Sequence, residues 1–392
     1  MSRVVKIGDI ASLKTGPFGT QFSAKEYTSE GIPVINVKNI GYGQILENDL
    51  DYIHESTRNR LSEHVLKTGD IVFGRKGSVD RHAYIGENHN GWVQGSDCIR
   101  LRFQEDVNTR YISHYLKLDH VKKQINHASI GSTMASLNTD ILKNIKIILP
   151  ELSVQNSIEG VLSSLESKVD VNSKICFELE AMAKTLYDYW FVQFDFPDEN
   201  GKPYRTSGGE MVWNEQLKRE IPKGWNVTNI GNLTTVVTGK EDANFSSPNG
   251  KYKFFTCSQE TLLCDTPAFS GQAVLIAGNG DFNVKHYSGE FNAYQRTYVL
   301  IPENQVYYGA MYISAKNQIQ AFKNGSNGSI VKFITKGDVE NIPFILPNDD
   351  LIFHQINKLI EKIELCEREN EELTKLRDWL LLMLMNGQAR VE

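Results

Sequence analysis

The chain has 392 residues, of which 40% are hydrophobic and 23% charged, as in ordinary folded proteins. At roughly 100–200 residues per domain, this length predicts two or three folded units. The longest apolar run, Trp379–Met385, has seven residues, far below the roughly 18 of a membrane span. Five cysteines without a CxxC pair argue against a disulfide framework, and the N-terminus lacks an apolar signal segment, so we expect a cytoplasmic protein.

The net charge of -6 hides an uneven distribution along the chain. Residues 1–150 carry 19 basic and 16 acidic side chains, and residues 201–347 carry 14 and 12. The acid is concentrated in residues 151–200, with 3 basic and 10 acidic side chains, and in residues 348–392, with 6 and 10. Either helices simply favour Glu, or two mildly basic domains that can approach a polyanion alternate with two acidic connectors.

An internal repeat divides the chain in the same way. Asn144–Pro150 matches Asn341–Pro347, since each is a short apolar run that ends in Leu-Pro and leads into a long helical pattern. Within the repeated parts, short β-rich runs such as 32–37 and 295–301 are separated by turn residues, and Tyr111–Ile125 is the clearest helical pattern. The fold class is therefore predicted as α+β, in the order domain, helix, domain, helix.

The two connectors have the heptad pattern of a coiled coil. In residues 153–190, apolar positions alternate at spacings of four and three, and residues 356–384 repeat this less strictly. Asn172 and Asn370 interrupt the two seams at matching positions, either fixing the register or lying at a solvated edge. If the helices pair antiparallel, the repeats form a pseudo-twofold arrangement of two similar domains on one rod. Such a rod suits a reader of two DNA half-sites, but an ordinary helical hairpin between domains of any function fits equally well.

A search for catalytic motifs favours a binding protein. The sequence has no GxxxxGK[ST] loop, no GxGxxG that opens a helix, no Asn/Asp-Pro-Pro-aromatic tetrapeptide and no HExxH or paired-histidine zinc spacing. We therefore predict no catalytic residues and no metal site in this chain.

Three stretches give the chain a family resemblance. Leu149–Ile158 has the pattern Leu-Pro-x-x-x-x-Gln-x-x-Ile, Tyr187–Phe196 resembles the end of a central helix, and Ile221–Trp225 resembles the entry to a second domain. Together they resemble the specificity subunit of a Type I restriction-modification system over the whole chain. The second long helix departs from the pattern, because Gln355 and Ile356 are adjacent.

The resemblance implies a non-catalytic DNA specificity subunit with two tandem target-recognition domains. Each domain would read one half of a bipartite, asymmetric sequence in double-stranded DNA, and the antiparallel coiled coil would set the spacer. It also implies partners: two DNA adenine methyltransferase (modification) subunits and restriction/translocase subunits, with no membrane. AdoMet, ATP and Mg²⁺ would belong to those partners, with no cofactor in this chain. The resulting division of the chain is 1–150, first target-recognition domain; 151–193, central helix; 194–224, linker; 225–347, second target-recognition domain; 348–392, C-terminal helix.

Candidate DNA contacts are polar and cationic residues on Gly-rich or turn-rich loops, because base edges and phosphates are read by such side chains. In the first domain they are Lys14, Thr15, Lys38, Asn39, Arg75, Lys76, Ser78, Arg81, Ser132 and Thr133. In the second they are Lys240, Asn279, Lys285, Arg296, Lys323, Ser326 and Asn327. Candidate partner-docking residues lie at the apolar helix ends: Trp190, Phe191, Trp379, Leu380 and Met383.

Two other functions stay open from the sequence. One is the recognition subunit of a different DNA methylation or restriction assembly with the same duplicated layout. The other is a protein-interaction scaffold whose coiled coil assembles an unrelated complex. The salt dependence of DNA binding distinguishes a DNA-recognition subunit from a scaffold. Phosphate contacts make DNA affinity fall steeply as the salt concentration rises, whereas a scaffold would not bind DNA.

Overall fold

The computed structural model describes residues 3–104, 106–129, 136–324 and 333–391, without the side chains of residues 321–324. These residues form two compact units, one from residues 1–169 with 372–392 and the other from residues 170–371. Two long helices, α6 (Leu152–Tyr187) and α9 (Leu351–Met385), each contribute to both units. This division follows packing and cuts through both helices, so the five-part division of the sequence stays a prediction.

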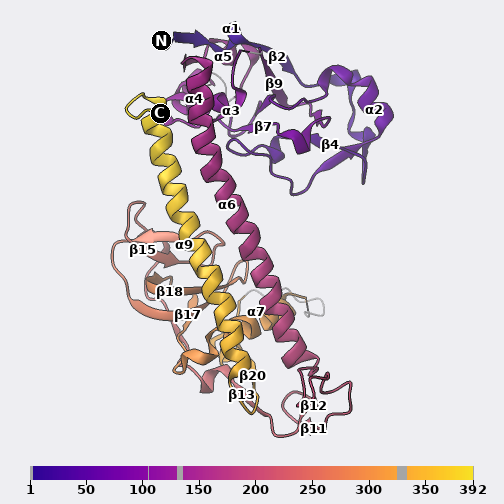
Figure 1. The fold of residues 1–392 in the computed structure, drawn as a ribbon, viewed down its shortest axis with the longest axis vertical. Helices are drawn as coiled ribbons and strands as arrows, with labels where there is room; N and C mark the ends of the chain where they lie inside the picture. Colours follow the sequence, from indigo (N-terminus) through magenta and orange to yellow (C-terminus); the bar gives the residue numbers. More distant parts are fainter. Residues whose placement is uncertain (1–2, 105, 130–135, 325–332, 392) are drawn as a thin grey trace. The chain divides into compact units, whose positions relative to one another are not determined.

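The globular part of the first unit is built on three small sheets (Figure 1). One has the order β2-β9-β6-β7 and is antiparallel throughout; the second has the order β3-β5-β4-β8, with β4 and β8 parallel; β1 pairs with β10. The strands are β1 (Arg3–Lys6), β2 (Ala11–Thr15), β3 (Tyr27–Thr28), β4 (Ile32–Ile35), β5 (Asp51–Ile53), β6 (Ile71–Gly74), β7 (His82–Tyr84), β8 (Val93–Gln94), β9 (Cys98–Phe103) and β10 (Lys146–Leu149). The helices are α1 (Ile7–Ile10), α2 (Glu55–Arg60), α3 (Thr109–Leu116), α4 (Asp119–Ser129) and α5 (Thr139–Asn144).

The helical pattern expected over Tyr111–Ile125 is divided into α3 and α4. Helix α3 follows its cap Asn108, whose side chain accepts a hydrogen bond from the Tyr111 amide, and it ends at Leu116, before the cap Lys117. Val121 and Ile125 of α4 are buried in the same core as Tyr111 of α3. The apolar spacing therefore predicted the buried face correctly, but it did not show the break.

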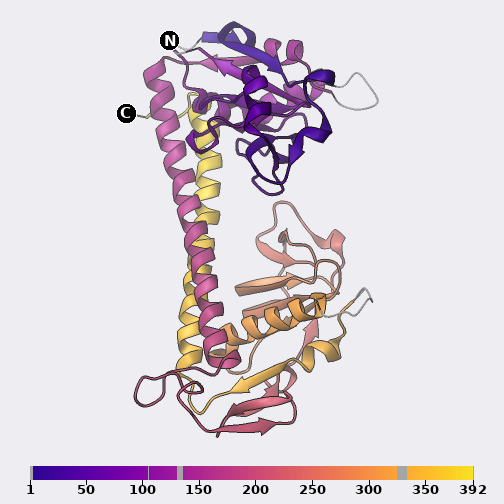
Figure 2. The same cartoon turned by 90° about the vertical axis from the view of Figure 1, so that its right-hand side faces the viewer.

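The second unit contains a six-stranded mixed sheet in the order β14-β19-β17-β18-β15-β16, with β15 and β18 parallel. Helix α7 (Tyr308–Asn324) packs across β17 and β18 (Figure 2). The other helix of this part, α8 (Lys336–Glu340), is short. The strands are β11 (Met211–Asn214), β12 (Arg219–Pro222), β13 (Asn226–Asn229), β14 (Val237–Thr238), β15 (Tyr252–Phe255), β16 (Leu262–Cys264), β17 (Phe269–Ala277), β18 (Val284–Ala293), β19 (Thr297–Leu300) and β20 (Pro343–Leu346).

The repeat seen in the sequence is a repeat of structure. In the first unit, the entry strand β1 pairs antiparallel with β10, the strand that ends in Leu-Pro. In the second unit, β13 pairs with β20 in the same way. The Ile7 amide donates to the Ile145 carbonyl at 3.0 Å, and the Ile230 amide donates to the Ile342 carbonyl at 2.9 Å. Each domain is thus closed by the same pair of strands immediately before its long helix.

Within each unit, α6 and α9 pack antiparallel. In the second unit, the Asn172 amide group donates to Glu369 at 2.7 Å, and Asn370 donates to Ser173 at 3.2 Å. Asn172 is buried, which places it within the seam and not at a solvated edge. In the first unit, Ile158 and Leu162 of α6 share a core cluster with Leu384 and Met385 of α9. The helices therefore pair within one chain.

A glutamate on a long helix holds each globular part to that helix. In the first unit, Glu166 of α6 accepts from Lys117 at 2.8 Å and faces His114 of α3 at 3.7 Å. Burial raises the pKa of Glu166, but the charge of Lys117 and its hydrogen bond to the carboxylate help to outweigh this effect, and the pKa is lowered. In the second unit, the Tyr308 hydroxyl of α7 donates to Glu364 of α9 at 2.6 Å. The first contact is half-buried and the second is buried, and polar contacts shielded from water need defined geometry to be stable.

An aromatic cluster holds the linker after α6 to the second unit. Residues Asp188–Val192 form a π-helical turn, which places Trp190 at 5.0 Å from the ring of Phe196 and Phe191 at 5.6 Å from the ring of Phe353. Trp225, just before β13, lies 4.7 Å from the Phe196 ring. The aromatic-rich sequence of this linker therefore serves internal packing.

Among the helices that the structure describes, we find none with the length and hydropathy needed to cross a membrane.

Candidate nucleic-acid interface

The most exposed group of predicted contacts in the first unit is the loop between β6 and β7. Its ends are held by backbone hydrogen bonds. The Arg75 amide donates to the Asp97 carbonyl at 2.8 Å, and the Arg81 amide donates to the Ser78 carbonyl at 3.1 Å. Val79 is buried beneath the loop. Lys76 and Ser78 are exposed between these anchors, and the Lys76 ammonium group pairs with Asp97 at 3.3 Å. The structure therefore presents both side chains on a constrained turn. A loop held in this way can offer side chains to base edges without first being ordered.

The two arginines of this loop lie over exposed aromatic rings. The Arg75 guanidinium lies 5.0 Å from the ring centre of Phe18, and that of Arg81 lies 5.7 Å from the ring centre of Tyr42. Lys122 of α4 approaches the same Tyr42 ring at 4.9 Å. Phe18, Tyr42 and Lys122 are not among the contacts predicted from the sequence. The only signal was an aromatic residue between glycines in Gly41-Tyr42-Gly43.

Other predicted contacts of the first domain are engaged within the chain. Lys14 of β2 pairs with Glu63, and Thr15, which ends β2, is half-buried opposite Ile99 of β9. Lys38 lies between Asp49, at 2.8 Å, and Asp51, at 3.1 Å. The hydrogen bond to Asp49 raises the pKa of Lys38. These lysines reach a phosphate only by exchanging a carboxylate for it.

Asn39 lies inside the domain and shapes its loop. It is buried, its side-chain amide donates to the Leu46 carbonyl at 3.1 Å, and its side-chain oxygen accepts from the Asn36 amide at 3.2 Å. In this structure Asn39 orders the turn that carries Tyr42. Ser132 and Thr133 lie outside the described residues, so their predicted role is left as it stood.

In the second unit, three predicted contacts gather at one end of the six-stranded sheet. The segments after β14, after β17 and before β19 meet there, with the Gly278 amide donating to the Arg296 carbonyl at 2.9 Å. A Cβ on Gly239 would lie 1.8 Å from the Ala293 carbonyl oxygen, so this close approach requires glycine. A cavity of about 390 Å³ opens between the segments, lined by Thr238, Gly278, Asn279, Gln295, Arg296, Tyr298, Phe333 and Ile334. Lys240, the residue after Gly239, is exposed.

This arrangement suits polar recognition. Asn279 and Gln295 supply paired donors and acceptors, and Arg296 supplies a fork of donors, the groups that read base edges in a major groove. Asn279 and Arg296 are predicted separately from the sequence, and the sheet brings them to one cavity. Lys323 lies in the last turn of α7, and Ser326 and Asn327 lie outside the described residues.

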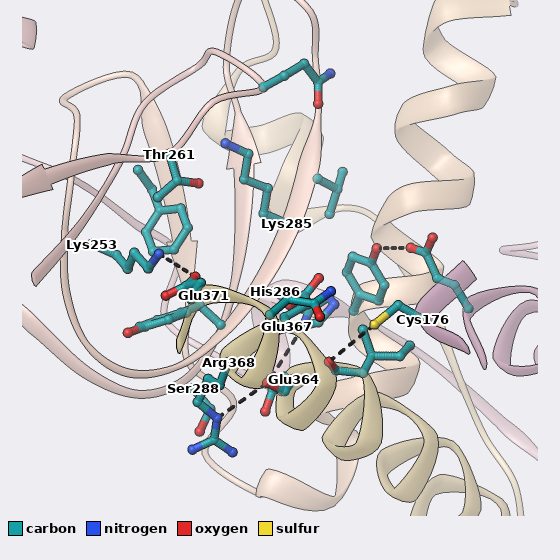
Figure 3. Close-up of a pocket in the computed structure, with 18 of the residues that line it drawn as sticks. Cys176, Lys253, Thr261, Lys285, His286, Ser288, Glu364, Glu367, Arg368 and Glu371 are labelled. Carbon is teal, nitrogen blue, oxygen red and sulfur yellow. Dashed lines mark hydrogen bonds and ion pairs between the residues drawn. The ribbon is translucent and has the colours of Figure 1, made fainter. Parts of the chain in front are cut away.

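Lys285 lies at a different place, in a cavity of about 660 Å³ between β18 and the long helices of the second unit (Figure 3). Its ammonium group donates to the Ser258 carbonyl at 2.8 Å and lies 5.8 Å from the Phe255 ring. Burial lowers the pKa of Lys285. The same cavity holds Glu364, Glu367 and several other charged side chains. Lys285 is therefore not part of the group formed by Asn279 and Arg296.

The predicted docking residues are divided between core and surface. Phe191 is 1% exposed, and Trp190 is half-buried in the linker's aromatic cluster. Neither side chain therefore offers a free apolar face. Leu380 packs against the core of the first unit, and Met383 is half-buried. Trp379 is 54% exposed, with the exposed side chains of Leu376 and Leu382 one turn away on either side. A broad apolar strip of α9, formed by Leu376, Trp379 and Leu382, is thus open to solvent in the first unit.

The fold and these loops define a duplicated reader on paired helices, and comparison with known proteins identifies its family. The sequence profile described as "Type I restriction modification DNA specificity domain" matches residues 2–181 and 222–375. The chain belongs to this family of DNA specificity subunits, which are the non-catalytic DNA-recognition components of Type I restriction-modification systems.

Individual relatives agree with the family. The chain is 34% identical over 180 residues to the Type I restriction enzyme EcoDI specificity subunit of Escherichia coli, a match that covers 44% of this chain and 40% of that protein. It is 23% identical over 424 residues to the MjaIX specificity subunit of Methanocaldococcus jannaschii, covering 99% and 94%. The crystal structure of the S subunit from M. genitalium is similar in fold, with a TM-score of 0.60 at 15% identity, covering 98% and 96%.

Proposed function

We propose that this specificity subunit reads a bipartite, asymmetric DNA sequence, with one half read by each globular domain. The observation that carries the proposal is the duplication: each domain is closed by the same strand pair and presents its own exposed polar loop group. In the first domain this group is the β6–β7 loop, and in the second it surrounds Asn279 and Arg296. Because the two groups differ in sequence and shape, the two halves of the target would differ.

Recognition would combine two kinds of contact. Arginine and amide side chains supply direct readout of bases, and exposed cations supply phosphate contacts that fix the position on the duplex. The helix pair would keep the two loop groups at a set spacing along the duplex, so the number of base pairs between half-sites would follow from helix length.

We also propose the identity of the partners. Two DNA adenine methyltransferase subunits would dock on the long helices, and restriction/translocase subunits would join them, with AdoMet, ATP and Mg²⁺ bound by those subunits. The exposed apolar strip of α9 around Trp379 supports this, because solvent-exposed apolar patches mark interaction surfaces. Among the described residues, no group of three or more His, Cys, Asp or Glu side chains is arranged to hold a metal ion. The complex would work in the cytoplasm, where the host DNA is.

The experiment is a pull-down of the tagged full chain from its own host in the presence of AdoMet, with proteins quantified and bound DNA sequenced. The proposal predicts a methyltransferase at two copies per chain and DNA enriched in a split motif. Trp379→Ala should reduce the methyltransferase recovered. Leu365→Ala is a matched control, because Leu365 is also exposed on α9 but lies in the second unit. Recovery of unrelated proteins with no enriched DNA would contradict the proposal and favour a scaffold.

A further inference from the structure

The turn that carries Tyr42 is fixed before any ligand arrives. The Gly43 amide donates to the His82 carbonyl at 2.7 Å, and Tyr42 forms an isolated parallel bridge with His82. Gly43 has a φ of +84°, and a Cβ there would lie 2.2 Å from the Lys117 side chain. The backbone therefore packs tightly while the Tyr42 ring stays 47% exposed. An exposed aromatic ring on so constrained a turn needs an explanation other than core packing.

Two cations from different elements converge on this ring. Arg81 comes from the β6–β7 loop and Lys122 from α4, at 5.7 Å and 4.9 Å from the ring centre. The negative face of an aromatic ring attracts cations. Two like charges on one ring nevertheless repel each other, and an anion placed between them relieves that repulsion.

Several other cations of the first domain are paired with carboxylates. Lys14 pairs with Glu63, Lys117 with Glu166, and Arg102 with the buried Asp70 at 2.7 Å. For Arg81 and Lys122, no ion pair with a carboxylate is found among the described residues. These two cations are thus held by an aromatic ring and left with their charge toward solvent.

We propose that Tyr42, Arg81 and Lys122 form a binding site for a backbone phosphate of double-stranded DNA. The inference rests on the DNA-recognition role proposed above and adds the residues that would fix the first domain's position. The phosphate lies beside the β6–β7 loop, which leaves the exposed Lys76 and Ser78 at the middle of that loop to approach base edges. Arg75 at the other end of the loop is a third cation, and it too lies over an exposed aromatic ring, that of Phe18.

The test measures binding of the full chain to a fluorescent duplex of unrelated sequence over a range of salt concentrations. Lys122→Ala and Arg81→Ala should each weaken binding about 3- to 10-fold on every duplex tested. Each should also reduce the slope of log affinity against log salt by about 0.9, the value for one lost phosphate contact. Tyr42→Leu should weaken binding with the slope nearly unchanged, because the charges remain but lose their position.

Lys123→Ala is the matched control, because Lys123 is the next residue of α4, is exposed, and approaches no ring among the described residues. It should change the affinity less than 2-fold. Equal effects of Lys122→Ala and Lys123→Ala, with each variant melting as the wild type does, would overturn the phosphate site. A loss confined to one DNA sequence would overturn it too, since it would indicate base reading. If the folded wild-type chain binds no duplex at any salt concentration, the proposed function itself fails.

Discussion

The replacement Phe191→Ala tests whether the π-helical turn after α6 is a core element or a free docking surface. Phe191 is 1% exposed, and its ring lies 4.9 Å from that of Tyr187, 5.6 Å from that of Phe353 and 5.8 Å from that of Trp225. Burying a Phe side chain removes on the order of 200 Å² from water, which at about 25 cal/mol/Å² stabilises by about 5 kcal/mol. Truncation keeps the Cβ and leaves a cavity, so we expect a loss of about 3–5 kcal/mol in the free energy of unfolding.

The assay is urea unfolding of the full chain followed by tryptophan fluorescence, because Trp190 and Trp225 lie in the same cluster. With a slope of about 2 kcal/mol/M, the midpoint of the second unit's transition should fall by about 1.5–2.5 M. Phe177→Ala is the control, since Phe177 lies on α6, before the π-helical turn, and is 70% exposed. It should change the free energy of unfolding by less than about 1 kcal/mol. Equal midpoints for the two variants would refute the assignment of Phe191 to the core.

Three further predictions concern the charged and polar interior. Burial lowers the pKa of His82 to about 3 and of His114 to about 4; both stay neutral when folded, so the stability present above pH 6.5 is lost as pH falls toward 4. Urea unfolding at pH 7 and at pH 5 should show that the free energy of unfolding falls by about 2 kcal/mol per histidine between the two pH values. The fall should be smaller in His114→Gln. A free energy of unfolding that does not change with pH would contradict this prediction. Asp70→Asn removes the carboxylate that Arg102 contacts at 2.8 and 2.7 Å and should cost about 2–4 kcal/mol by thermal unfolding. Asn172→Leu, which places an apolar side chain in the seam, should raise the melting temperature while light scattering reports oligomers that the wild type does not form.

The repeat and the long helices could be predicted because they depend on local signals. Leu149 and Leu346 end the closing strands of the two domains, and each is followed by heptads that require no knowledge of distant residues. Asn172 could be assigned to a seam from spacing alone, and the structure buries it there. The order domain, helix, domain, helix follows from these signals.

The site was harder to predict because exposure is a property of tertiary packing. Asn39 and Lys285 have the chemistry of DNA contacts, yet one is buried within its loop and the other lines a cavity against the helices. Conversely, Tyr42 and Lys122 are 80 residues apart in sequence, and only the fold brings the lysine over the ring. Residue type identified what could bind DNA, but the arrangement of loops decides which side chains are presented.

The most direct test of the central claim selects DNA from a randomised duplex pool with the full chain and with one variant in each domain. The first variant carries Arg75→Ala and Lys76→Ala, and the second carries Asn279→Ala and Arg296→Ala. We predict that the wild type enriches a motif of two separated parts, and that each variant loses sequence preference in one part only, a different part for each. A single continuous motif, or the loss of both parts with either variant, would contradict the assignment of one half-site to each domain.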